Sequence, residues 1–217
     1  MIDTGGNGVE RRFRGEAHRW DQIYDDSGHP LARLWDRLTR DNVRRRFMRT
    51  FEAAGDLAGR SVLDLGCGSG RYLIEAVSRG AKRAVGVDFA PEMIEVARRL
   101  AGASPNGDRI QLCCGDVRDR EPTGPFDLVI ANGLFDYVES PLPVLAAAWH
   151  RTSGTLVATF PNAFAPRALP RWMYWRMRGL TIRLFQREAI VAAARAASIE
   201  SPAIERIGPI FMLIARR

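Results

Sequence analysis

The sequence predicts an α/β fold, a seven-stranded and mostly parallel sheet with helices on both faces and a C-terminal antiparallel hairpin. From about residue 61, short apolar runs alternate with amphipathic stretches, as in the repeated strand–helix units that build parallel sheets. The last two apolar runs, 199–207 and 209–216, are separated only by Gly208. So short a connection requires that these two strands pair antiparallel.

The expected elements follow from local patterns. Gly80 is typical of the end of a helix, and Pro91 suits the first position of one. Residues 30–54 have apolar side chains at helical spacing, as one helix or as two that break near Asn42. Residues 182–197 indicate a short extended piece and a helix. The other strands are expected at 62–65, 84–88, 109–114, 126–131 and 154–160, with helices at 70–79, 91–101 and about 141–149.

Length and composition indicate a single domain with a sizeable core, because the chain has 217 residues of which 46% are hydrophobic. The net charge is +7, and Lys82 is the only lysine, so arginine supplies the excess. Solvated basic faces explain this charge, while an acidic substrate, nucleic acid or a membrane surface remain open. We expect residues 1–15 to be a disordered tail and residues 16–217 to form the domain.

The cysteines Cys67, Cys113 and Cys114 have no zinc-ligand spacing, and no metal is expected. They are expected to be reduced thiols in a cytoplasmic protein. No signal peptide and no apolar stretch of about 18 residues is recognisable, so the sequence predicts no spanning helix.

A glycine-rich turn after the first strand is the most informative motif. Gly66, Gly68 and Gly70 alternate with other residues, so a ligand could approach the backbone closely there. The helix that follows would present free N–H groups to an anionic group of that ligand. Asp64 precedes the turn, and Asp88 ends the next strand, about 20 residues after the first glycine, where a ribose diol is usually held.

The spacing separates two kinds of cofactor. A nicotinamide site requires G-x-G-x-x-G, but here Arg71 occupies the place of the third glycine. The run from Asp64 to Gly70 instead resembles the D-x-G-x-G-x-G motif of class I S-adenosylmethionine (SAM)-dependent methyltransferases, which have a Rossmann-like sheet. A glycine turn without a ligand is the alternative.

The resemblance implies a set of cofactor contacts. Gly66, Cys67 and Gly68 would contact the methionyl part of SAM through their backbone, and Asp64 would orient its ammonium group. Asp88 would accept hydrogen bonds from both ribose hydroxyls. Against the adenine, the resemblance places Phe89, Asp116 and Val117. The alternatives are a core role for Phe89 and a turn or cap role for Asp116.

The segment after the fourth parallel strand is where the family places the reacting methyl group and the substrate. It lacks the N/D-P-P-Y/F run of DNA and some protein amine methylases. Asn132 is expected to contact the amino-acid end of SAM or the substrate, and Tyr137 the substrate. Asp136 is the candidate general base, with a surface or helix-cap acid as the alternative.

The run Arg19-Trp20-Asp21-Gln22-Ile23-Tyr24 resembles the R-W-x-x-I-Y of magnesium-protoporphyrin O-methyltransferases. That resemblance implies that Tyr24 lies over SAM and that residues 16–55 form a helical lid. One departure is that Asp136 stands where that group has a histidine.

Residues 161–185 mix aromatic and arginine side chains and contain three prolines, which we expect to break the segment into short pieces. We predict a substrate cap above the carboxyl edge of the sheet, with Trp172, Trp175 and Arg176 contacting the substrate. A packed insertion and a membrane-surface helix are the alternatives.

The sequence therefore predicts an enzyme that moves a methyl group from SAM to a small molecule and leaves S-adenosylhomocysteine. O-methylation of a flat or apolar metabolite, acidic or not, is favoured, and a nucleic-acid partner is not expected. An RNA or protein methyltransferase and a catalytically silent SAM-binding protein are the alternatives. The sequence does not assign an oligomeric state.

Overall fold

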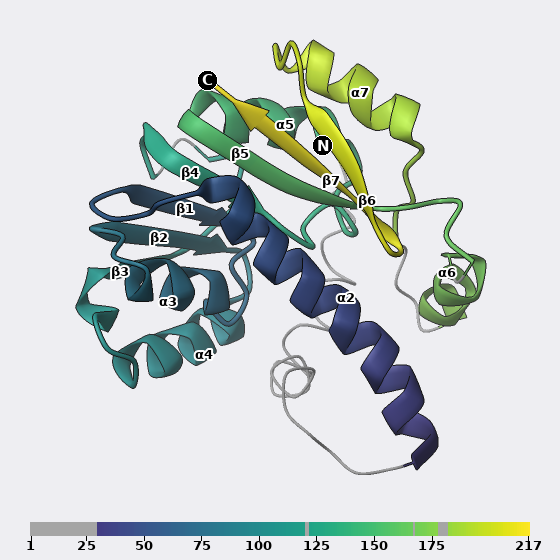
Figure 1. Cartoon of the computed structure of the whole chain (residues 1–217), viewed down its shortest axis with the longest axis horizontal. Helices are drawn as coiled ribbons and strands as arrows, with labels where there is room; N and C mark the ends of the chain where they lie inside the picture. Colours follow the sequence, from purple (N-terminus) through teal and green to yellow (C-terminus); the bar gives the residue numbers. More distant parts are fainter. Residues whose placement is uncertain (1–29, 120–121, 167, 178–181) are drawn as a thin grey trace, which may run out of the picture.

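The computed structural model describes residues 30–119, 122–166, 168–177 and 182–217. They form a seven-stranded sheet in the order β3-β2-β1-β4-β5-β7-β6 (Figure 1). The parallel strands are β1 (Ser61–Leu65), β2 (Arg83–Asp88), β3 (Ile110–Cys114), β4 (Phe126–Ala131) and β5 (Thr152–Pro161). The antiparallel strands are β6 (Ala203–Ile207) and β7 (Ile210–Arg216). The predicted fold class is confirmed.

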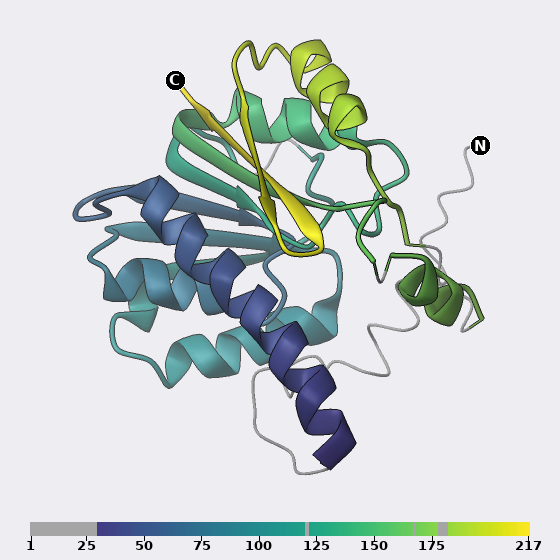
Figure 2. The ribbon, with the colours of Figure 1, turned by 45° about the vertical axis from the view of Figure 1, so that its right-hand side comes forward.

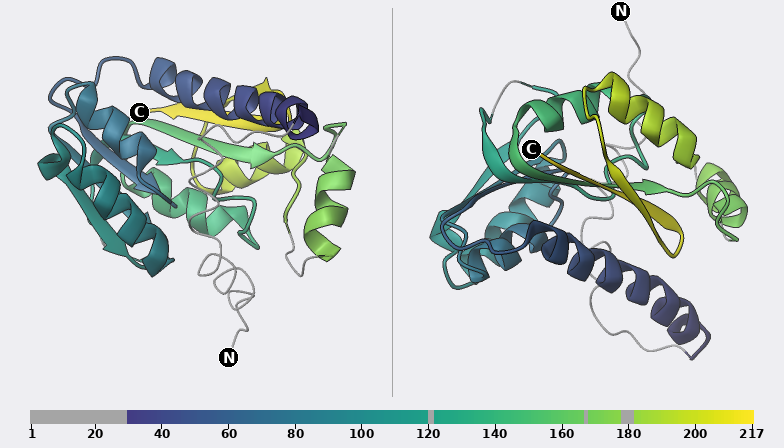
Figure 3. Two further views of the ribbon diagram at one scale, coloured as in Figure 1. Left: turned by 90° about the horizontal axis from the view of Figure 1, so that it is seen from below. Right: turned by 45° about the horizontal axis from the view of Figure 1, so that its top comes forward.

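Helices cover both faces of the sheet (Figures 2 and 3). On one face lie α2 (Pro30–Ala54), α3 (Arg71–Ser78) and α4 (Pro91–Gly102). On the other lie α5 (Pro141–His150) and α7 (Arg187–Ala196). A short 3-10 helix, η2 (Gly107–Arg109), precedes β3, and α6 (Ala168–Met177) stands apart from the sheet, beyond β5 (Figures 1 and 2).

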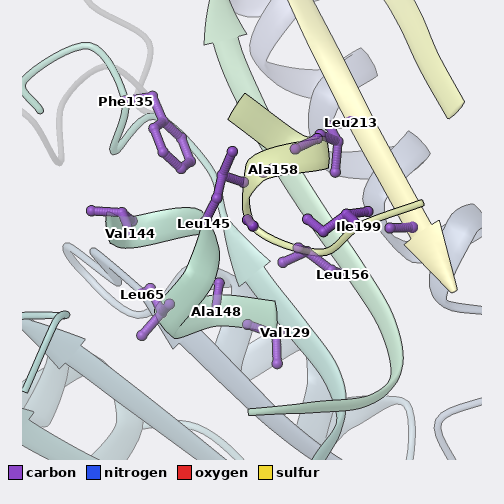
Figure 4. Close-up of a cluster of buried hydrophobic side chains, with 14 of the residues drawn as sticks. Leu65, Val129, Phe135, Val144, Leu145, Ala148, Leu156, Ala158, Ile199 and Leu213 are labelled. Atoms are coloured by element: carbon purple, nitrogen blue, oxygen red, sulfur yellow. The ribbon is translucent and has the colours of Figure 1, made fainter. Parts of the chain in front are cut away.

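The core has two layers because alternate strand residues face opposite sides of the sheet. In β1, Leu63 and Leu65 pack towards α5 and α7, whereas Val62 packs towards α2 and α3. Figure 4 shows part of the first layer, where α5 and β5 side chains meet Ile199 and Leu213. Both faces of the central strands are therefore buried, as is typical of a parallel sheet.

One open alternative about the elements is decided and two expectations are corrected. Residues 30–54 form one helix, because α2 runs through Asn42 without a break, where asparagine costs a helix only a fraction of a kcal/mol. Asn42 also packs against the β6–β7 turn, where a Cβ on Gly208 would come within 2.2 Å of its Oδ1. Segment 161–185 contains a ten-residue helix, α6, because Pro170 falls in its first turn, where proline is tolerated. The β6 strand begins at Ala203 rather than at Ile199, whose side chain instead fills the core.

Helix α2 is held to the sheet at its C-terminal half. The Arg49 Nε donates to Glu205 Oε2 of β6 at 2.7 Å, and Arg216 Nη2 donates to the Ala53 carbonyl at 3.3 Å. The Phe47 ring lies 5.0 Å from the rings of both Phe51 and Tyr72, which joins α2 to α3. The last turns of α2 are thereby fixed against β6, β7 and α3.

Gly86 gives a test of the packing beneath the glycine turn. A Cβ at this β2 position would lie 2.5 Å from Leu73 Cδ1 and 2.8 Å from Cys67 Sγ, both on buried residues. We expect Gly86→Ala to lower the free energy of unfolding by about 1–3 kcal/mol through overpacking. Gly102→Ala is the control, because a Cβ there meets nothing within 4 Å. Urea denaturation measures both, and equal stability of the two variants would contradict this packing.

Candidate functional site

The candidate site lies where the parallel strands end. Strand β1 pairs with β2 on one side and β4 on the other, so the residues at their carboxyl ends meet at one edge. This edge carries Asp64 in β1, Asp88 at the end of β2 and Asn132 directly after β4. Open parallel sheets bind their ligands at such an edge.

The glycine turn is shaped by backbone conformations that favour glycine. Gly66, Gly68 and Gly70 have φ of 75°, 52° and 77°, in the left-handed region. The N–H groups of Gly66 and Cys67 both donate to the Val87 carbonyl, at 2.8 and 3.0 Å. The turn is therefore tied to the end of β2.

The Asp88 side chain also holds the glycine turn, through hydrogen bonds from backbone N–H groups. Its Oδ2 accepts from Gly68 N at 2.9 Å and its Oδ1 from Ala90 N at 3.0 Å. Burial raises the pKa of Asp88, and these backbone hydrogen bonds oppose the rise. Each carboxylate oxygen has a further lone pair, so Asp88 can hold the turn and still accept from a ligand hydroxyl.

Asp64 is a buried acid with an unused oxygen. Its side chain is 1% exposed and its Oδ2 has no hydrogen-bond partner among the described residues. Burial, followed by the neighbouring Asp88 carboxyl, raises the pKa of Asp64 to about 8, against the opposing effect of Arg46. A cation placed at this oxygen would favour the ionised form.

Asn132 presents a second buried acceptor, and its orientation is set by α2. Its Nδ2 donates to Thr50 Oγ1 at 3.0 Å, and that hydroxyl gives its only proton to the Arg46 carbonyl at 2.8 Å. Thr50 can therefore only accept from the amide, which fixes Nδ2 towards α2. The Asn132 Oδ1 on the other side is buried and has no partner among the described residues.

Thr50 and Arg46 are site residues that the sequence reading missed. Gly133 follows Asn132 with φ of 74°, and a Cβ there would lie 3.3 Å from Arg46 Nη1. The Gly133 N–H donates to Thr159 Oγ1 of β5 at 3.0 Å. Thr50 and Arg46 lie on an ordinary arginine-rich helix, and no sequence motif marks them.

The three residues predicted to contact the adenine differ in their surroundings. Phe89 is 39% exposed, so the alternative of a core residue is wrong. Asp116 accepts from its neighbour Arg118, whose Nε lies 2.9 Å from Oδ1 and whose Nη2 contacts Oδ2, and this guanidinium lowers the pKa of Asp116. The Val117 carbonyl accepts from Arg151 Nη1 at 2.8 Å. The turn role considered for Asp116 is thus present, and an adenine amino group would have to share this carboxylate with Arg118.

Asp136 lies in the segment after β4 and is 8% exposed, so the surface alternative for it is wrong. It is also five residues before α5 and therefore not its cap. Its carbonyl accepts from Arg183 N at 2.9 Å, which brings the end of segment 161–185 to this loop. Tyr137 is half-buried and closes a turn by donating its N–H to the Leu134 carbonyl at 3.1 Å.

On α6, the Arg176 guanidinium lies 5.3 Å from the Trp172 ring centroid. Tyr24 and the side chain of Trp175 lie outside the described residues, as does the predicted tail 1–15. In the described ranges, no three His, Cys, Asp or Glu side chains are grouped to hold a metal ion. The structure thus gathers Asp64, Asp88, Asn132 and the glycine turn, and adds Thr50 and Arg46.

Comparisons with known proteins agree with this geometry. A family model described as a methyltransferase domain matches residues 62–153. The chain is 29% identical over 168 residues to a malonyl-[acyl-carrier protein] O-methyltransferase of Halalkalibacterium halodurans, covering 72% of this chain and 56% of that protein. It is 39% identical over 92 residues to a ribosomal protein L11 methyltransferase of Actinobacillus succinogenes, covering 42% of this chain and 30% of that one.

Among solved structures, magnesium protoporphyrin IX methyltransferase from Synechocystis PCC 6803 with bound S-adenosylhomocysteine matches with a TM-score of 0.77. The match covers 96% of this chain and 98% of that one at 19% identity, so it shows the fold. The chain spans about half or less of the length of the two curated relatives named above. Within those bounds, residues 62–153 match a methyltransferase domain, in agreement with the SAM-dependent class that the glycine turn and its acids predicted.

Proposed function

We propose that this protein transfers a methyl group from SAM to a small-molecule acceptor, by O-methylation of a flat or apolar metabolite that can carry an acid. One observation carries the proposal. Among the described residues, Asp64 Oδ2 and Asn132 Oδ1 are two buried acceptors without hydrogen-bond partners, both at the edge where β1 and β4 end beside the glycine turn. Unsatisfied buried acceptors are costly, and the ammonium group of SAM would satisfy them.

The residues present fit SAM. Asp64 and Asn132 would take the ammonium group, and the backbone of Gly66, Cys67 and Gly68 would line the methionyl chain. Asp88 would accept from the ribose, using the lone pairs that Gly68 N and Ala90 N leave. For the adenine we propose Phe89, Asp116 and Val117, and for a lid residue Tyr24.

SAM supplies a methyl group on a sulfonium that is already a good leaving group. The protein then has mainly to hold the acceptor atom, the methyl carbon and the sulfur in line. Asp136 is proposed as the base that takes a proton from an acceptor hydroxyl. Its burial in the loop after β4, on the carboxyl side of the sheet, supports this role.

The acceptor would lie between that loop and segment 161–185. The hydrogen bond from Arg183 N to the Asp136 carbonyl joins the two. Tyr137, Trp172 and Trp175 would supply flat apolar area, and Arg176 a partner for a carboxylate. The relative named as an O-methyltransferase supports oxygen as the accepting atom.

A protein acceptor is the second candidate, because the match to the ribosomal protein L11 methyltransferase named above has 39% identity. That match covers only 42% of this chain. Incubation with methyl-labelled SAM decides between the candidates. Label in small hydroxy or carboxy compounds supports the proposal, label in ribosomal protein supports the second candidate, and SAM binding without turnover on either would indicate a silent protein.

Proton release on binding tests the role of Asp64. At pH 7 its carboxyl is protonated, since its pKa is about 8. A bound ammonium group would lower that pKa, so binding should expel close to one proton and tighten as the pH rises from about 6 to 8. Calorimetry of S-adenosylhomocysteine in two buffers of different ionisation enthalpy measures the proton. Asp64→Asn is the control and should release about one proton fewer, so identical proton release by both proteins contradicts the assignment.

The Thr50–Asn132 contact can be tested with a matched pair of threonines. Thr50→Val should lower the free energy of unfolding by about 1–3 kcal/mol, because the buried Asn132 amide loses its acceptor. It should also weaken S-adenosylhomocysteine binding, because Oδ1 is no longer held in place. Thr152→Val is the control: its hydroxyl likewise donates to the carbonyl four residues earlier, at 2.8 Å, but at the start of β5. Equal loss of affinity in both variants would count against the contact.

The variant Asp136→Asn tests whether Asp136 acts as a general base or whether positioning of the acceptor alone is enough. If Asp136 takes the proton, turnover should fall about 10²-fold or more while S-adenosylhomocysteine affinity stays nearly unchanged. Turnover is measured as steady-state rates across pH, with the acceptor that the labelling experiment identifies. Calorimetry measures the affinity for S-adenosylhomocysteine. A variant that keeps its rate at every pH shows that positioning alone suffices.

A further inference from the structure

The largest exposed apolar side chains gather on and beside α6. Large hydrophobic residues at the surface of the described ranges are few, and four of them are more than half exposed: Phe164 at 69%, Leu169 at 63%, Met173 at 51% and Met177 at 86%. All four lie within 14 residues of sequence. A concentrated apolar patch of this kind marks an interaction site more often than scattered exposure does.

Helical geometry places three of these side chains on one face. Leu169, Met173 and Met177 are spaced by four residues, so they form one row along α6. The preceding Ala168 is 5% exposed and marks the side of α6 that faces the protein. The row of Leu169, Met173 and Met177, with Phe164, is called the α6 apolar face below.

Phe164 is held in place rather than left on a loose loop. Its N–H donates to Asn162 Oδ1 at 2.9 Å, and the neighbouring Ala163 N–H donates to the Phe185 carbonyl at 2.9 Å. Ala165, directly after it, is buried. An exposed phenyl ring on a hydrogen-bonded turn loses little conformational entropy when it meets a partner.

The stretch of sequence that contains α6 carries charge of one sign. Residues 162–187 contain six arginines and neither aspartate nor glutamate, although the whole chain has 25 acidic residues. Arg176 lies on α6 against Trp172, and Arg183 Nη2 lies 3.8 Å from Glu139 Oε1. The segment therefore combines exposed aliphatic and aromatic groups with a local excess of positive charge.

We propose that the α6 apolar face docks this protein onto an anionic lipid surface. Flexible methionine and leucine side chains suit the acyl boundary, and arginines suit the anionic headgroups just above it. A nucleic acid would use the charge but not the aliphatic row. In the described ranges no helix is long and apolar enough to cross a bilayer. Figures 1 and 2 show α6 apart from the sheet.

Vesicle co-sedimentation tests the proposal on the full chain. Wild-type protein should pellet with vesicles of mixed phosphatidylcholine and phosphatidylglycerol, far less with phosphatidylcholine alone, and less again at high salt because charges are screened. The triple variant Leu169→Ser/Met173→Ser/Met177→Ser should partition onto the anionic vesicles at least about tenfold less than wild type. The control Met48→Ser/Leu142→Ser removes two exposed apolar side chains on α2 and α5 and should partition like wild type.

The outcomes are distinct. Equal partitioning of the triple variant and wild type, or no binding of wild type to anionic vesicles, overturns the proposal. Binding that needs the arginine charge but is insensitive to the triple substitution also overturns it, since the apolar face is then not used. Calorimetry with S-adenosylhomocysteine is run on the same proteins and should give equal affinities, which shows that the variants are folded. Failure of cofactor binding in wild type would instead contradict the proposed function.

Discussion

The double attachment of the glycine turn to the end of β2 is the constraint on which the site depends. The Val87 carbonyl and the Asp88 carboxylate together hold the N–H groups of Gly66, Cys67 and Gly68. This arrangement places two acids, Asp64 and Asp88, at the ends of adjacent buried strands, where burial and the Asp88 carboxyl raise the pKa of Asp64. The protein thus holds two buried acids at one edge of the sheet, where a cationic ligand would favour their ionised forms. The same Asp88 carboxylate also accepts from Ala90 N, so it joins the glycine turn to the residue that precedes α4.

Helix α2 completes the candidate site, although it precedes the alternating strands and helices that begin with β1. Its ion pair with Glu205 and its aromatic contacts with Tyr72 anchor the turn that carries Arg46 and Thr50. Thr50 then decides which way the Asn132 amide points, and Arg46 moderates the pKa of Asp64. A helix near the start of the chain therefore tunes residues at the ends of β1 and β4. If SAM binds at Asn132 as proposed, stability and cofactor affinity are coupled there, because one buried hydroxyl serves both.

Segment 161–185 meets the rest of the protein at its two ends. Phe185 forms a bridge with Asn162 and packs on Phe160, with ring centroids 5.3 Å apart, so the segment leaves and re-enters the core at one place. Between these ends lies α6, whose apolar face is exposed. Docking of α6 would bring a lipid surface to the same segment that is proposed to cover an apolar acceptor.

The sequence by itself determined the α/β fold, the antiparallel hairpin and the glycine turn between Asp64 and Asp88. These follow from local rules: apolar periodicity, positive φ at glycine, and acids at fixed spacing from a turn. It could not show that α2 continues through Asn42, that Asp116 is paired with Arg118, or that Asp136 is buried. Nor could it reveal Thr50 and Arg46, which are 82 and 86 residues before Asn132 in the chain. Only the tertiary structure decided these points, because hydrogen bonds between distant residues depend on how helices pack on the sheet and leave no periodic trace in the sequence.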